Sequence, residues 1–88
     1  MDISRTPIAE RIARVLAAER ISANGGGDAE SASAQVDGAW KDHLPEAIAV
    51  LRTLREPDER MAAVGDVAVW ERMVRAAIEA SLPPKVVM

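Results

Sequence analysis

The cluster Asp42-His43-x-x-Glu46 holds the residue types closest to a metal site. Asp42 and Glu46 are four residues apart, so they would share one face of an unbroken helix. Metal sites need three or four converging ligands, and this chain has one histidine and no cysteine. Pro45 also interrupts the helix that would align them. We therefore expect no metal site, and we place Asp42 and His43 at a helix end before Pro45, where the helix dipole favours histidine.

The sequence contains no other pattern typical of catalysis. A nucleophile needs a positioned base, but the serines fall in expected helix ends and linkers, away from His43. The carboxylates of Asp58 and Glu59 lie in the first turn of an expected helix, where the dipole alone favours acids. The glycines at 25–27 lack the Gly-Lys-Ser/Thr that follows a phosphate-binding loop. These observations predict a protein that is not an enzyme and has no catalytic, cofactor-binding or metal-binding residues.

Basic residues do not form an uninterrupted face. Residues 1–22 hold four arginines and three acids, and between residues 52 and 60 three arginines are interleaved with three acids. A helix-turn-helix fits residues 46–65, but its second helix, 57–65, carries one arginine and two acids. Binding to nucleic acid is therefore not the expected function, and a DNA-associated regulator is kept as the alternative.

Two tryptophans are the only aromatic residues. Both lie at core spacing on expected amphipathic helices, which favours burial. Tryptophan is also the residue most enriched in binding hot spots, and methionine adapts to irregular partners. The candidate partner-contacting residues are Trp40, Trp70, Met61 and Met73.

Periodicity and breakers divide the chain into helices. Apolar spacing predicts helices over 7–22, 33–55 and 67–82, with a short helix at 57–65. Three glycines make 23–31 a flexible linker, and 84–88 follows Pro83-Pro84 as a loose tail. Asp66 is expected to cap the last helix. In the first helix, the stripe expected to be buried is Ile8, Ile12, Val15 and Leu16.

Pro45 leaves two outcomes open for the second helix. Proline lacks a backbone N–H and clashes with the carbonyl four residues earlier, here that of Lys41. The segment is either one kinked helix or a short helix to about His43 followed by a new helix with Pro45 in its first turn. Because the apolar stripe keeps its phase, the two parts should be nearly collinear or meet at a modest bend.

Composition supports an all-helical fold. Alanine occurs 17 times and arginine outnumbers lysine nine to two, and both alanine and arginine favour helices. The same bias is typical of GC-rich bacterial genomes. We predict a single all-α domain over residues 1–88, an irregular bundle of three main helices with the second bent at Pro45. The chain shows no signal-peptide pattern and no apolar run near 20 residues, which predicts a cytoplasmic protein without membrane contact.

Part of the sequence resembles a known group. Trp40, Leu44-Pro45-Glu46-Ala47, Leu54-Arg55-Glu56-Pro57, Gly65 and Trp70 resemble a pattern in short, functionally uncharacterised helical proteins of alphaproteobacteria. The resemblance covers residues 40–77. It implies a compact helical domain and no catalytic activity.

Together these features predict a small non-catalytic protein-interaction or adaptor module that binds an unknown protein partner. The apolar stripe of helix 7–22 must pack against another apolar surface. The linker after this helix is long enough for that surface to belong to a second chain. We therefore expect a monomer that forms a weak or helix-swapped dimer.

Overall fold

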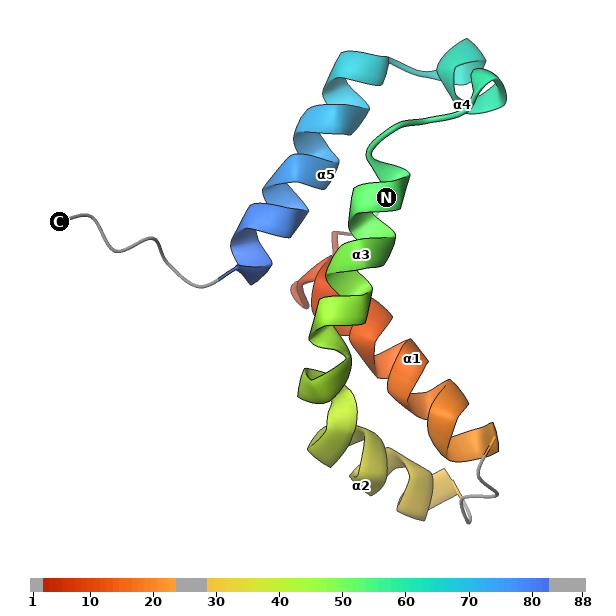
Figure 1. Ribbon diagram of the computed structural model, residues 1–88, viewed down its shortest axis with the longest axis vertical. Coiled ribbons are helices and arrows are strands. Elements are labelled where there is room, and N and C mark those ends of the chain that lie inside the picture. Colours follow the sequence, from red (N-terminus) through yellow and green to blue (C-terminus); the bar gives the residue numbers. More distant parts are fainter. Residues whose placement is uncertain (1–2, 24–28, 83–88) are drawn as a thin grey trace, which may run out of the picture.

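The computed structural model describes residues 3–23 and 29–82 (Figure 1). In these ranges the chain is mostly helical and contains no strand, so the predicted all-α fold is confirmed. The elements in chain order are α1 (Ile8–Ala23), α2 (Ala29–Ala39), the 3₁₀ helix η1 (Trp40–His43), α3 (Leu44–Leu54), α4 (Glu59–Val64) and α5 (Val67–Ser81).

The helices pack as an open bundle. α1 packs along α2, η1 and α3, and α5 packs beside α3 and the start of α1 (Figure 1). α4 lies at the far end of the α3–α5 pair and has no extensive contact with another helix of the described chain. None of the described helices combines the length and the apolar character needed to cross a bilayer.

The linker predicted at 23–31 is too wide. α1 continues through Ala23, and α2 already begins at Ala29. Alanine and glutamate favour helix, so α2 forms soon after the glycines end. The remaining linker residues, 24–28, and the predicted tail at 84–88 lie outside the described residues.

Pro45 divides the second helical segment into two helices, which was one of the two expected outcomes; the other was a single kinked helix. α3 starts at Leu44, with Pro45 in its first turn, where the missing N–H needs no acceptor. The N–H of Leu44 donates to the Lys41 carbonyl, which closes a 3₁₀ turn in place of the bond that proline cannot make. His43 is the last residue of this turn, as expected. α2 and α3 consequently meet at a visible bend (Figure 1).

The face that α1 buries differs from the predicted one. Its buried residues are Ala9, Ala13 and Ala17, whereas Val15 is 60% exposed and Ile8 is 40% exposed. Small side chains let α1 approach its neighbours closely, because the distance between helix axes depends on the side chains at the contact. The expectation that Ile8, Ile12, Val15 and Leu16 form the buried stripe is therefore wrong. Ile12 and Leu16 are half-buried.

A small core joins α1, α3 and α5. Its buried residues are Ala9, Leu51, Val74 and Ile78, with half-buried residues such as Ile48 and Trp70 packed around them. Asp66 caps α5, as predicted, by accepting a hydrogen bond from the Val69 N–H at 3.2 Å. Asp58 caps α4 in the same way through the Met61 N–H at 3.0 Å. The two caps fix where α4 and α5 begin.

Replacing the buried alanine at the centre of α1 tests this packing. Ala13→Leu should lower the free energy of unfolding by about 1–3 kcal/mol, because extra methylenes in a filled contact force the helices apart. The exposed Ala18→Leu on the same helix should change it by less than about 0.5 kcal/mol. Urea unfolding followed by circular dichroism measures both. A strongly destabilising Val15→Asp together with a harmless Ala13→Leu would contradict the observed face.

Candidate functional site: an apolar pocket at Trp70

Three of the four predicted partner-contacting residues lie around one place in the fold. Trp70 and Met61 line one hollow, and Trp70 and Met73 line another. They come from α4 and α5, which the sequence separates by the Gly65-Asp66 turn. The fourth residue, Trp40, belongs to η1 and packs against α1 instead.

Trp70 is fixed by a hydrogen bond at the end of α3. Its indole Nε1–H donates to the carbonyl oxygen of Leu54 at 2.6 Å. Leu54 is the last residue of α3, and a carbonyl there has no partner within its own helix. The indole therefore caps α3 while its ring packs against the core. This contact attaches the start of α5 to the end of α3.

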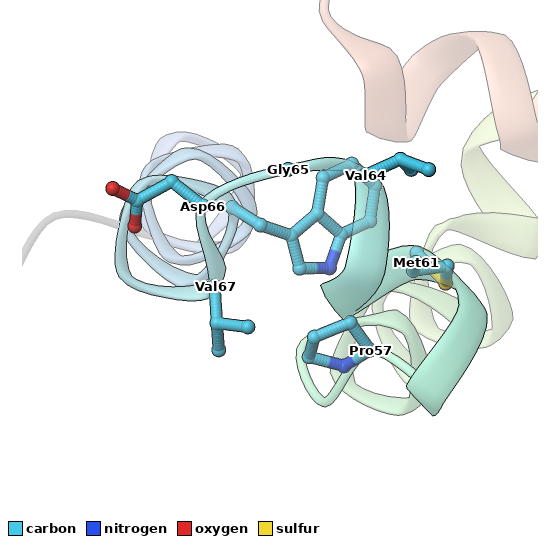
Figure 2. Close-up of a pocket in the computed structure, with 7 residues that line it drawn as sticks. Pro57, Met61, Val64, Gly65, Asp66 and Val67 are labelled. Atoms are coloured by element: carbon cyan, nitrogen blue, oxygen red, sulfur yellow. The ribbon is translucent and has the colours of Figure 1, made fainter.

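The first hollow lies between the α3–α4 connection, α4 and the start of α5. It has a volume of about 230 Å³ and is lined by Pro57, Met61, Val64, Gly65, Asp66, Val67 and Trp70. Figure 2 shows Pro57, Met61 and Val67 around it. The Asp66 carboxylate points away, which agrees with its role as the cap of α5. The surface that a ligand would touch is therefore apolar.

A second hollow lies between α5, the end of α3 and the start of α1. It measures about 180 Å³ and is lined entirely by apolar or aromatic residues, among them Ile8, Leu54, Trp70 and Met73. Met73 is 62% exposed at its edge. Trp70 therefore lines both hollows.

Trp40 already has neighbours within the chain. The guanidinium of Arg14 lies 5.3 Å from the centre of its ring, and the ammonium of Lys41 lies 5.8 Å away. Arg14 also donates to Asp37 at 2.7 Å and to Glu10 at 2.9 Å. The hydrogen bond to Asp37, followed by that to Glu10, raises the pKa of Arg14. These contacts connect α1 to α2 and η1.

The residues considered for metal chemistry form only a pair. Nδ1 of His43 lies 3.3 Å from a carboxylate oxygen of Glu46, one turn further along. In the part of the chain that the structure describes, no three metal-ligating side chains gather at one point. Asp58, weighed above as half of a carboxylate pair, accepts the capping hydrogen bond of α4.

Sequence reasoning missed several residues that line the first hollow. Pro57 and Val67, which the sequence places only at helix starts, line it together with Trp70. A short helix flanked by Pro57 and Gly65, directly before a tryptophan-containing helix, was the available signal. Periodicity cannot show how a six-residue helix folds over the end of its neighbours, because that depends on two connecting turns.

Comparison with known proteins gives no identification. No protein-family model, curated protein or solved structure matches this chain. The resemblance to short helical proteins of alphaproteobacteria therefore stays a prediction.

Removing the indole N–H tests the link between α3 and α5. Trp70→Phe should lower the free energy of unfolding by about 1 kcal/mol through the lost hydrogen bond. Trp70→Ala should cost about 3 kcal/mol, near the low end for large-to-small core changes, because the ring is only half-buried. Trp40→Phe, which keeps a ring beneath Arg14, should cost less than Trp70→Phe. Equal effects of the two phenylalanine substitutions would contradict the capping role of Trp70.

Proposed function

We propose that this chain is a non-catalytic protein-interaction module that receives one large apolar side chain of a partner protein in the hollow at Trp70. The observation that carries the proposal is an open hollow of about 230 Å³ with an apolar wall and a tryptophan in it. Interfaces place their anchor residues in pockets of this character, with tryptophan prominent among the residues that carry the binding energy.

The wall of the hollow combines a fixed part with an adaptable part. Trp70 is held by its hydrogen bond to Leu54, so binding does not have to order it. Ordering a free side chain at an interface costs about 0.5–1.5 kcal/mol, so a fixed ring favours affinity. Met61 lies opposite on α4 and is flexible and polarisable, which suits anchors of differing shape.

An exposed valine supports contact with a partner at this end of the molecule. Val64 lines the hollow, yet 87% of its surface is accessible. Met61 and Val67 are also more than one-third exposed. Neighbouring apolar side chains left in water are typical of surfaces that another molecule covers.

DNA association, the alternative from the sequence, has less support. A recognition helix must lie along the major groove, and α4 has six residues, fewer than two turns. Its basic residue, Arg60, stands next to Glu59. We therefore treat a salt-dependent shift of duplex DNA as an outcome that would favour the alternative.

Selection of peptides from a random displayed library tests the proposal. Peptides that bind the chain should share one large aromatic or aliphatic residue. Met61→Glu should weaken their binding at least about tenfold, because it brings a charge into an apolar wall. Ala62→Glu adds the same charge to the same helix at a residue outside the lining, and it should leave binding unchanged.

Two results would contradict this function. Selected peptides without an apolar anchor would show that the hollow does not direct binding. Equal binding by the Met61→Glu and Ala62→Glu proteins would show that the peptides contact another surface. Circular dichroism of both variants confirms that each remains helical before binding is compared.

A further inference from the structure

α5 carries more apolar surface than its neighbours cover. Val74 and Ile78 face the core and are buried. A second line of apolar residues runs along the helix beside this face and remains accessible. It consists of Val69, 40% exposed, Met73, 62% exposed, and the exposed alanines 76 and 80. We call these four residues the α5 seam.

The spacing of the α5 seam is that of a helix-pairing surface. Its residues are separated by four, three and four positions. This alternation is the apolar repeat of a coiled coil, in which each residue inserts between side chains of a facing helix. The α5 seam therefore matches one more helix packed along α5, and no helix within residues 3–23 and 29–82 occupies that place.

The sizes of the seam residues fit a second copy of α5 in the antiparallel direction. With the two-fold axis between positions 74 and 75, Val69 faces the partner's Ala80. In the same alignment Met73 faces the partner's Ala76. Each of the four layers then contains one large and one small residue, so the helix separation stays constant along the pair. If one helix were shifted by seven residues along the other, fewer seam residues would face a seam residue of the partner.

The charges beside the α5 seam support the same alignment. Arg72 and Glu79 flank it on one side, both exposed, and neither belongs to an ion pair with another described residue. In an antiparallel pair, the residues on the same edge of the two contact surfaces lie side by side. Here these are the residue before Met73 and the residue before the partner's Ala80. Arg72 therefore lies against the partner's Glu79, and symmetry forms the pair twice. A parallel alignment would put Arg72 beside the partner's Ala77 and form no such pair.

The neighbouring hollow extends this contact surface. Met73 shares the hollow of about 180 Å³ with Ile8 and Leu54, both more than one-third exposed. A helix lying on the α5 seam would run beside this hollow and cover part of it. The seam itself spans twelve residues, or about 17 Å of helix, so the contact is short for a stable dimer.

We propose that two copies of this chain associate weakly through antiparallel α5 helices, with the α5 seam as the contact and Arg72 paired to the partner's Glu79. This proposal is independent of the proposed function, because the seam does not line the hollow that contains Met61. The association is reversible and depends on protein concentration.

Sedimentation equilibrium over about 10 μM to about 1 mM measures the association, since a short interface binds in the micromolar range or more weakly. The dimer fraction should rise with concentration. Met73→Asp should weaken dimerisation at least about tenfold, because it buries a charge in the contact. Ala68→Asp adds the same charge to the same helix outside the seam and should dimerise like the parent. Met61→Glu should also leave dimerisation unchanged, which separates this proposal from the peptide site.

Exchanging charges tests the alignment. Arg72→Glu and Glu79→Arg should each weaken the dimer by about threefold to tenfold, since each sets like charges against one another at two symmetric places. The double variant restores opposite charges and should regain most of the parental affinity.

Cysteine cross-linking gives an independent readout, because the chain contains no cysteine. Mixed Val69→Cys and Ala80→Cys proteins should form a disulfide between unlike chains under oxidising conditions. A protein that stays monomeric throughout the range would overturn the proposal. A Met73→Asp protein that dimerises with the parental dissociation constant would do so as well, since an exchanged α1 or another surface would then make the contact. Cross-links only between like chains would show a parallel pair and also overturn it.

Discussion

The close packing of α1 against α2, η1 and α3 decides which apolar side chains this chain buries. α1 uses its alanines, Ala9, Ala13 and Ala17, for that contact. Because these residues are small, the helices lie close together, but little apolar surface is removed from water there. The larger residues Ile8 and Val15 remain accessible as a result. The core shared with α3 and α5 is therefore small, and Leu51 is the largest fully buried side chain among the described residues.

Because the core is small, a few individual contacts hold α5 against α3. α5 is joined to α3 by buried Val74 and Ile78 and by the indole N–H of Trp70 at the Leu54 carbonyl. The hydrogen bond uses an acceptor that the end of α3 leaves open. It also sets the ring between two hollows. The same residue thus supports the fold and shapes the surface, so the choice between a core tryptophan and an interface tryptophan does not apply to Trp70.

Proline positions, capping residues and apolar periodicity predicted most of the helices. They did not predict which faces of those helices pack together. Pro45 and Asp66 act through the backbone within a few residues, so the bend before α3 and the start of α5 follow from the sequence. In α1, two apolar stripes lie side by side, and periodicity cannot tell that the alanine stripe packs better. Trp40 and Trp70 have similar spacing patterns, yet Arg14 covers one and the hollows surround the other. The first contact arises only when α1 is placed against η1, and the hollow with Met61 only when α4 folds beside the start of α5.

Stability and binding are coupled in a domain of this kind. A chain of 88 residues has a free energy of unfolding of about 4–13 kcal/mol by per-residue averages. Any molecule that binds only the folded state adds to that value by mass action, by about 2.7 kcal/mol at a hundred times its dissociation constant. Both accessible surfaces involve α5, one at its start and one along its middle. A molecule in the hollow at Trp70 contacts α4 and α5 together, and a helix on the α5 seam lies beside the hollow that α5 shares with Leu54 and Ile8. Occupation of either surface therefore favours the folded arrangement in which α5 is attached to α3.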